Sequence, residues 1–167
     1  MSSSDSYHYA VSQLSWLFGC WEAIEAEVSY PTMDTLKYGE LLEFQPAYLQ
    51  PLIQYKSETW HPLKKQKLHI EVGFLKVDPD TQTVALLGAH NFGMTEVSEG
   101  VVKEHTLRLE SKSVCRTSFT KLASVVKLVR TLSLVNEELH SLMLMETVNQ
   151  PLQKHLECRY KRKSSSN

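Results

Sequence analysis

Carboxylate pairs and histidines are the side chains of this 167-residue chain that could carry chemistry. Glu40 and Glu43 are three residues apart, as are Glu22 and Glu25, but nothing in the sequence places either pair across a cleft where acid and base could act together. Solvated strand faces are the simpler interpretation of both pairs. The chain has no glycine-rich phosphate loop, GxSxG turn or HExxH helix, so the common nucleotide-binding and hydrolytic signatures are missing.

The seven histidines never show the HxH or HxxxH spacing of a zinc or copper site with several histidine ligands. A site with one histidine needs less, because haem brings four nitrogens of its own and requires only an axial imidazole and an apolar pocket. His69, His140 and His155 all lie in segments that read as strands, and the pattern alone does not choose among them.

The final strand candidate, residues 152–160, raises a difficulty for His155. Leu152, Leu156 and Tyr160 share one face of a period-2 pattern, and His155 lies on the other face. If the apolar face points into the protein, His155 points out of it. The pattern by itself therefore predicts an ordinary surface histidine, unless the pocket lies at an open rim or the interior there is partly polar.

Most of the chain reads as short strands separated by turns. Residues 10–19 have apolar positions at helical spacing and end at a glycine, which predicts one short helix. Alternation and turn residues predict strands at 68–77, 83–89, 106–110, 116–119, 125–135, 138–147 and 152–160. Eight to ten antiparallel strands indicate an all-β barrel or sandwich. We favour a barrel, because closure removes exposed edges and leaves room for one small ligand.

Length and composition predict a single domain at residues 9–163 between serine-rich, disordered tails at 1–8 and 164–167. The net charge of −1 provides no global basic field for nucleic acid or membrane, and no apolar run approaches the ~20 residues of a membrane-spanning helix. Lys64, Lys65 and Lys67 and the basic run 161–163 read as solvated loops.

The cysteines and the N-terminus indicate the cellular setting. Three widely spaced cysteines form no CxxC pair, and the N-terminus lacks the charged and apolar regions of a signal peptide. We therefore expect a reduced, cytoplasmic location, with the basic run 161–163 able to aid nuclear entry.

Four segments, in order along the chain, resemble the nitrobindin family: LSWLFGCW (14–21), YPT (30–32), LHIEVGF (68–74) and QPLQKHLECRYKRK (150–163). The resemblance runs from about Ser12 to Lys163. The family also includes the C-terminal domain of an animal THAP-type zinc-finger protein, but no zinc-finger pattern precedes the barrel here, so no direct nucleic-acid binding is expected. This chain departs from the family signature GxWxGxG, because Ala23 and Glu25 replace the two later glycines.

The resemblance implies a ten-stranded antiparallel β-barrel, similar to lipocalins and fatty-acid-binding proteins, that holds haem b near one end. It implies that a histidine of the last strand ligates the haem iron, and His155 in HLECRYK occupies that place. Thr32 matches the threonine beside the haem. His69 matches a histidine on the distal side of the haem, and Leu68 would lie alongside it.

The resemblance further implies a ferric iron that binds nitric oxide and isomerises peroxynitrite to nitrate. This reaction suits a sparse site, because it involves no net proton transfer and a Lewis-acidic iron can promote it. The expected ligands are the small molecules nitric oxide and peroxynitrite, no membrane association is expected, and the sequence does not reveal which partner proteins bind the chain. Two alternatives stay open. One is an iron-free carrier of an apolar ligand, walled by Trp16, Trp21, Phe74 and the Met143/Met145 strand; the other is an interaction module that kept the barrel and lost haem.

Overall fold

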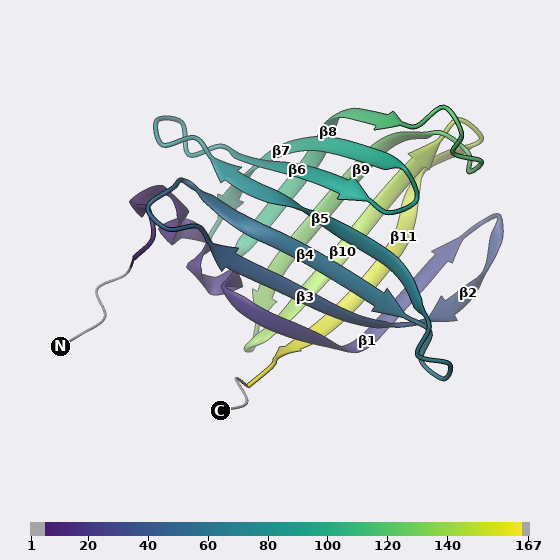
Figure 1. Ribbon diagram of the computed structural model, residues 1–167, viewed down its shortest axis with the longest axis horizontal. Helices are drawn as coiled ribbons and strands as arrows, with labels where there is room; N and C mark the ends of the chain where they lie inside the picture. Colours follow the sequence, from purple (N-terminus) through teal and green to yellow (C-terminus); the bar gives the residue numbers. More distant parts are fainter. Residues whose placement is uncertain (1–5, 165–167) are drawn as a thin grey trace.

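Antiparallel strands make up nearly all of the computed structural model, which describes residues 6–164 (Figure 1). Within that range one 3₁₀ helix precedes eleven strands. Their bounds are η1 Tyr9–Leu17, β1 Gly19–Tyr30, β2 Met33–Lys37, β3 Gly39–Pro46, β4 Leu52–Trp60, β5 Lys67–Val77, β6 Val84–His90, β7 Met94–Lys103, β8 Thr106–Arg116, β9 Val125–Val135, β10 Glu138–Thr147 and β11 Gln150–Arg162.

The strands close into a barrel. From β3 to β11 each strand pairs with the next along the chain, and β1 pairs with both β3 and β11. Ten strands therefore form the closed sheet, and β2 is an extra strand that pairs with the second half of β1. The prediction of an all-β antiparallel barrel with about ten strands and one short N-terminal helix is confirmed. No helix within residues 6–164 combines the length and apolarity that crossing a membrane would require.

The helix η1 closes one end of the barrel. Its side chains Val11, Leu14 and Leu17 are fully buried in the main hydrophobic core. The indole nitrogen of Trp21 donates to the carbonyl oxygen of Leu17 at 2.7 Å, which fixes the helix to the start of β1. In Figure 1, η1 lies at one end of the molecule, and β2 lies at the other. The core therefore fills the η1 end of the barrel.

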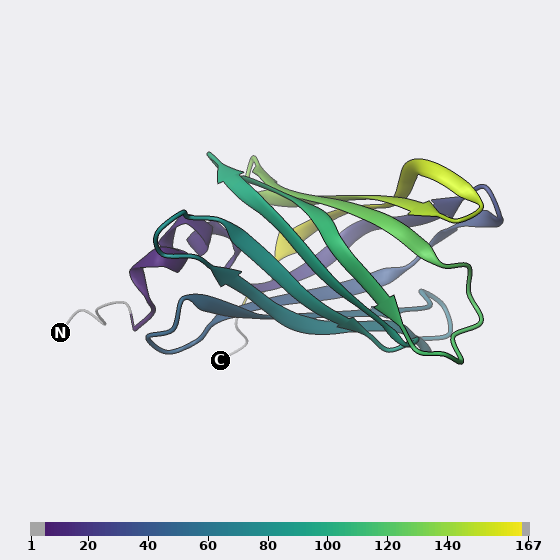
Figure 2. The same ribbon diagram turned by 90° about the horizontal axis from the view of Figure 1, so that it is seen from above.

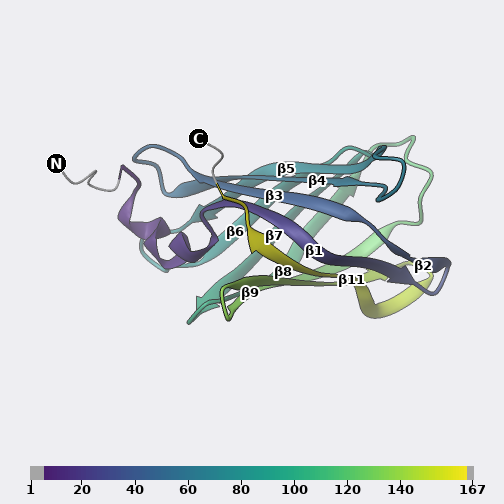
Figure 3. The same ribbon diagram turned by 90° about the horizontal axis from the view of Figure 1, so that it is seen from below.

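The opposite end is bounded by connections between strands. The view from above shows two layers of strands that separate toward the β8–β9 loop, and the view from below shows β1 beside β11 along the seam of the barrel (Figures 2 and 3). The β1–β2 turn, the β8–β9 loop and the β10–β11 turn all lie at this end. They surround the site described below.

Three predictions of detail are wrong. Residues 116–119 are not a separate strand, since β8 continues to Arg116 and the chain then forms a loop in which the Thr117 nitrogen donates to the Gly93 oxygen at 2.8 Å. Residues 6–8 are not a disordered tail, because Tyr7 forms a β-bridge with Tyr48 and packs edge-on against Phe18. The remainder of the predicted tails at 1–5 and 165–167 lies outside the described residues.

The third correction concerns β5. Its apolar residues Val72 and Phe74 are 45% and 43% exposed, so they lie on the outer face, whereas Glu71 and Leu75 on the alternate face are buried. Phe74 is therefore not a wall of an internal carrier cavity. The strand does alternate as predicted, but the face that contains His69 and Glu71 points into the barrel, and the face that contains Phe74 points out of it.

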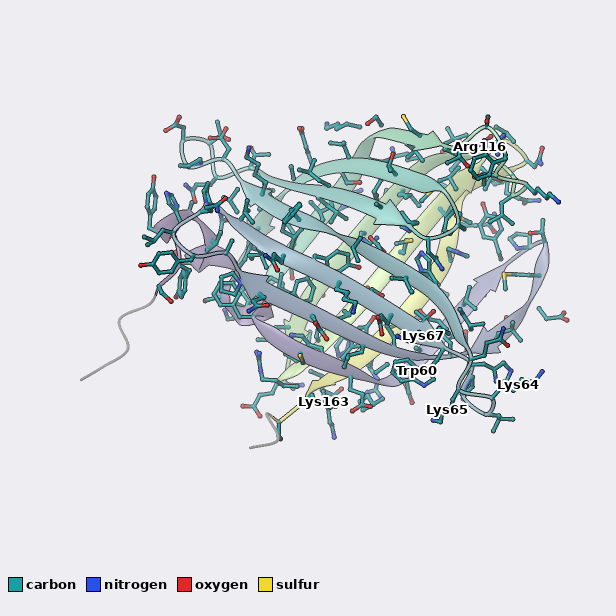
Figure 4. All side chains as sticks on the ribbon, viewed as in Figure 1. Trp60, Lys64, Lys65, Lys67, Arg116 and Lys163 are labelled. Carbon is teal, nitrogen blue, oxygen red and sulfur yellow. The ribbon has the colours of Figure 1, made fainter. Side chains whose placement is uncertain are left out.

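The basic side chains form separate groups. Figure 4 shows Lys64, Lys65 and Lys67 near the β4–β5 turn, with Lys163 and Arg116 far from them. Lys67 pairs with Glu58 at 2.7 Å, so part of this charge is neutralised locally. These two basic runs do not join into one surface.

Candidate functional site

Two adjoining cavities occupy the barrel end opposite η1. The inner cavity, of about 380 Å³, lies within the barrel and includes His69, Met143 and His155 in its wall. The rim cavity, of about 390 Å³, lies under the β1–β2 turn and the β8–β9 loop and includes Thr32 and Leu122. Their walls share Phe92, Met94, Val125, Met145 and His155. A ligand too large for either cavity could therefore extend through both, past His155.

A β-bulge turns His155 toward these cavities. Across β10 and β11, Met143 pairs with Leu156 and Leu144 pairs with Lys154, so His155 is the extra residue between the two pairs. His155 and Leu156 are adjacent in the chain, yet both are half-buried and both line the inner cavity, which regular alternation does not permit. The prediction that His155 points to the surface is wrong because this one residue breaks the period.

The His155 ring is held in one tautomer. Its Nδ1 lies 3.1 Å from the carbonyl oxygen of Ser29 in β1. A carbonyl only accepts, so Nδ1 donates and Nε2 keeps a free lone pair. Tyr30 packs edge-on against the imidazole, with ring centroids 5.3 Å apart. Burial lowers the pKa of His155, although the hydrogen bond to Ser29 opposes this, so the neutral imidazole that a metal requires is favoured.

The other predicted site residues lie at the same end of the barrel. His69 and Leu68 line the inner cavity, and Thr32, in the exposed turn after β1, lines the rim cavity. Burial lowers the pKa of His69 to about 4, so its ring is neutral at pH 7. The structure thus brings Thr32, Leu68, His69 and His155 around two joined cavities. Their roles toward a cofactor stay a prediction.

A buried polar network behind His69 was not predicted from the sequence. At its centre, Arg130 Nη2 donates to Glu71 Oε1 at 2.8 Å and to Glu96 Oε1 at 3.1 Å. Arg130 Nη1 donates to the Tyr55 hydroxyl at 2.9 Å. The side chains of both glutamates are at most 3% exposed and that of Arg130 is 10% exposed, so these charges are paired away from water.

His90, the last residue of β6, joins this network to His69. Its Nδ1 lies 3.0 Å from His69 Nε2, and the two rings are nearly parallel, at 12°. Its Nε2 faces Glu96 Oε1 at 3.4 Å and Glu71 Oε1 at 3.9 Å. The ligand atoms of His69, Glu71 and His90 lie within 4.8 Å of one another, which is a possible metal-binding set. A hydrogen-bonded network describes it better, because Arg130 already pairs with Glu71 and the two ring nitrogens face each other.

Strand register explains why these residues meet. Glu71 in β5 is directly opposite His90 in β6, and Gly88 in β6 is directly opposite Glu96 in β7. A Cβ at Gly88 would come within 3.3 Å of Glu96 Cγ and 3.4 Å of Glu71 Oε1, so the glycine leaves room for both carboxylates. The sequence contained one sign of this network. His69 and Glu71 are two residues apart on β5, so they share the face that points inward.

Comparison with known proteins identifies the barrel. A family model described as the THAP4-like, heme-binding beta-barrel domain matches residues 10–162. The chain belongs to this family. The resemblance to nitrobindins found in the sequence is thereby confirmed.

Proteins similar to this chain include relatives from an animal and a plant. Peroxynitrite isomerase THAP4 of Homo sapiens is 34% identical over 154 residues, which cover 91% of this chain and 26% of that protein. The chain therefore spans about a quarter of the length of the human protein. Peroxynitrite isomerase Rv2717c of Arabidopsis thaliana is 32% identical over 155 residues, covering 92% of this chain and 89% of the relative. The crystal structure of Rv2717c from M. tuberculosis superimposes with a TM-score of 0.84 at 28% identity, covering 95% of this chain and 99% of the other.

The departure from the family glycines falls outside the cavities. Ala23 and Glu25 flank a register shift between β1 and β11, and neither lines the inner or the rim cavity. Glu25 is exposed and accepts a hydrogen bond from Arg159 Nε at 3.1 Å. Ala23 is half-buried and packs against the main hydrophobic core, whereas Glu25 lies at the outer face of the seam, so neither substitution falls in the walls of the two cavities.

Glu40 also differs from its expected role. The interpretation as solvated strand faces holds for Glu22 and Glu25, which are exposed, but Glu40 is buried and lines the inner cavity. It accepts hydrogen bonds from the Ser57 hydroxyl at 2.6 Å and the Tyr160 hydroxyl at 2.8 Å. Burial raises the pKa of Glu40, which these hydrogen bonds partly offset. The cavity thus has a polar floor at the side nearest the core.

Proposed function

We propose that this chain binds ferric haem b with His155 as the proximal ligand, that it binds nitric oxide, and that it isomerises peroxynitrite to nitrate. The observation that carries the proposal is the hydrogen bond from His155 Nδ1 to Ser29, which leaves Nε2 free where the two cavities meet. The description of the family as haem-binding and the relatives named peroxynitrite isomerases support it.

The residues around His155 fit a flat, largely apolar group. Met94, Leu128 and Met143 form a buried apolar cluster, against which the partly buried Val114, Val125, Met145 and Leu156 pack. At the rim, Phe92 and Leu122 are 38% and 60% exposed, and Met33 is 40% exposed. An apolar rim that protein atoms leave open is expected where the edge of a ligand packs. Each cavity already has the volume of a small-molecule site.

The chain's own residues would hold and shield the group. When bound, ferric haem supplies a Lewis-acidic iron suited to the isomerisation of peroxynitrite. His155 provides a neutral imidazole whose orientation is set by Ser29 and Tyr30. Met143 keeps water from the buried side, because it is only 7% exposed. Since isomerisation involves no net proton transfer, the reaction needs no acid–base pair beside His155, and the part of the chain that the structure describes provides none there.

Titration with hemin tests the proposal. Wild-type protein should give a sharp Soret band, His155→Ala should give none, and the control His140→Ala should behave as wild type. His140 suits the control because it lies on the neighbouring strand β10 with a side chain that is 39% exposed. The loaded protein should then bind nitric oxide and accelerate the conversion of peroxynitrite to nitrate, measured by stopped-flow absorbance and nitrate yield.

The same experiment separates the alternatives. A wild-type protein that takes up apolar dyes or lipids but shows no Soret band would be an iron-free carrier, and a protein that takes up neither would be an interaction module. Loss of the Soret band on replacing His69 but not His155 would mean that His69 is the iron ligand. The cytoplasmic location expected from the sequence stays a prediction.

A further inference from the structure

We propose that His90 fixes the tautomer of His69: His90 carries protons on both ring nitrogens, so that His69 presents Nδ1–H to the inner cavity as a hydrogen-bond donor. His90 would be a positioning residue, because it acts on the cavity through His69. Any hydrogen bond from His69 Nδ1–H to a bound ligand rests on the proposed function. The positions of the protons on His69 and His90 do not.

The geometry leaves one proton to be assigned. His90 Nε2 faces carboxylate oxygens of Glu96 at 3.4 Å and Glu71 at 3.9 Å, and carboxylates only accept, so Nε2 carries a hydrogen. Among the described residues this nitrogen is buried without a well-formed hydrogen bond, so the two glutamates are its nearest partners. On the other side of the ring, one proton must lie between His90 Nδ1 and His69 Nε2, which are 3.0 Å apart.

Charge balance assigns this proton to His90. Glu71 and Glu96 bring two negative charges into the barrel, and Arg130 supplies one positive charge to both. An uncompensated buried charge is costly, so a second cation beside the pair is strongly favoured. A doubly protonated His90 supplies it, because its Nε2 faces the same two oxygens, Glu71 Oε1 and Glu96 Oε1, to which Arg130 donates.

Among residues 6–164, no other group that faces the two carboxylates can supply that charge. Burial holds the pKa of Tyr55 well above its ordinary value, so its hydroxyl stays neutral. Ser98 donates a neutral hydrogen bond to Glu96 Oε2 at 2.8 Å. Although burial alone would raise the pKa of Glu96, the nearby His90, the charge of Arg130 and the hydrogen bond from Ser98 lower it to about 2, so this carboxylate stays ionised.

The consequence for His69 follows from its own protonation. Burial lowers its pKa to about 4, so at neutral pH the ring carries a single proton. If His90 Nδ1 donates to His69 Nε2, that proton lies on His69 Nδ1. Within residues 6–164 no protein partner of this nitrogen is found, and His69 lines the inner cavity. A buried carboxylate that sets a histidine tautomer through a hydrogen bond is a known device in catalytic sites.

The proton positions can be read directly by NMR of histidine ring nitrogens. We would label the histidines with ¹⁵N and record two-bond nitrogen–proton correlations at pH 7, on haem-free protein and on the diamagnetic ferrous carbon monoxide complex. The expected result is a doubly protonated His90 and a His69 that is protonated at Nδ1 alone. A His69 protonated at Nε2 beside a neutral His90 would overturn the proposal.

A substitution that leaves His69 itself unchanged gives a second, independent test. Glu96→Gln removes one carboxylate, so the remaining charges balance without the second proton on His90, and the His69 proton should move from Nδ1 to Nε2. The matched control is Glu99→Gln, an exposed glutamate on the same strand, which should leave both rings as in wild type. An unchanged His69 in folded Glu96→Gln would contradict the inference. If Glu96→Gln does not fold, Glu71→Gln makes the same prediction, and the wild-type spectrum decides by itself.

The result of these histidine measurements can be distinguished from the result of the hemin titration that tests the proposed function. In haem-free protein the histidine signals do not depend on a cofactor, so a failed hemin titration would remove the proposed function and leave this inference standing. In the carbon monoxide complex, loss of the Nδ1–H donor in Glu96→Gln should raise the C–O stretching frequency, and Glu99→Gln should not. A C–O frequency that is equal in Glu96→Gln and wild type would show that His69 does not donate into the cavity.

Discussion

His155 Nδ1 donates to the carbonyl oxygen of Ser29 across 3.1 Å, from the last strand of the barrel to the first. The β-bulge at His155 and this hydrogen bond act on different properties of the same side chain. The bulge turns the ring toward the cavities, and the Ser29 carbonyl selects the tautomer that leaves Nε2 free. The bulge exists relative to β10, and the hydrogen bond depends on the closure of β1 against β11, so both neighbours of β11 are needed to orient the candidate ligand.

Replacing His155 with glycine should create a site that accepts an external ligand. We expect His155→Gly to lower hemin affinity by about 100-fold or more, since even supporting residues of a metal site contribute 10–100-fold. Added imidazole should restore the Soret band by filling the space that the side chain leaves. The measurement is a hemin titration with and without imidazole. Failure of imidazole to restore the band, in a variant with wild-type circular dichroism, would argue against His155 as the ligand.

Tyr30 should stabilise the orientation of His155. Tyr30→Leu removes the edge-on contact between the rings, and we expect a 3- to 10-fold weaker hemin affinity, because such aromatic pairs contribute about 0.5–1.5 kcal/mol. Tyr30→Phe is the matched control: it keeps the ring and loses only the hydrogen bond to the Met145 oxygen at 3.2 Å. The measurement is the rate of hemin dissociation from each of the two variants. Equal losses in the two would mean that the hydroxyl, and not the ring, carries the effect.

Thr32 should influence ligand binding and not haem retention. It is exposed in the β1–β2 turn and lines only the rim cavity, so Thr32→Val, which keeps the shape and removes the hydroxyl, should leave hemin affinity within about 3-fold of wild type. The rate of nitric oxide dissociation should change if the hydroxyl polarises the bound ligand. Stopped-flow ligand replacement measures that rate. A variant that loses haem would show that Thr32 is needed for haem retention, contrary to this prediction, and one with unchanged kinetics would mean that its hydroxyl does not act on the bound ligand.

The local sequence pattern was enough to predict most strands and the fold class. The predicted strands 125–135 and 138–147 coincide with β9 and β10, because alternation and the turn between them are encoded in adjacent residues. Alternation also states which residues share a face, but not which face is inside. In β5 the inward face contains His69 and Glu71, whereas Phe74 points outward.

The site depends on relations between strands, which one strand's pattern does not contain. The bulge at His155 exists only relative to β10, where Met143 and Leu144 pair with residues on either side of it. Likewise, the meeting of Glu71, His90 and Glu96 requires the register of three strands. The resemblance to the nitrobindin family pointed to His155 when the pattern did not, because it compares segments from the whole length of the chain with proteins that share one fold.

Stability should fall in mild acid because of His69. Its pKa is lowered by burial to about 4, against 6.5 for an ordinary histidine, so between these values the unfolded state binds more protons than the folded state. Stability is then fully present above pH 6.5 and is lost as the pH falls toward 4, by about 2 kcal/mol at pH 5. Urea denaturation at pH 7.5 and pH 5 should show a smaller loss for His69→Gln than for wild type. His140→Gln serves as the control, and an equal loss in all three proteins would exclude His69 as the cause.

Arg130 should be the most sensitive residue of the buried network. Arg130→Met leaves the carboxylates of Glu71 and Glu96 inside the barrel without their cation, and breaking a buried ion pair by removing one partner costs about 3–5 kcal/mol. Adding Glu71→Gln and Glu96→Gln to Arg130→Met should recover part of that loss, because the unpaired charges are then gone.

The control for this series is Arg108→Met on β8. Arg108 is 58% exposed and pairs with Glu110 at 3.3 Å, and exposed ion pairs contribute little, so its removal should scarcely change the free energy of unfolding. Urea denaturation of the four proteins at pH 7.5 compares them directly. If Arg130→Met were no less stable than Arg108→Met, the two glutamates would have to be uncharged in the folded protein. The charge balance that assigns the second proton to His90 would then have no basis.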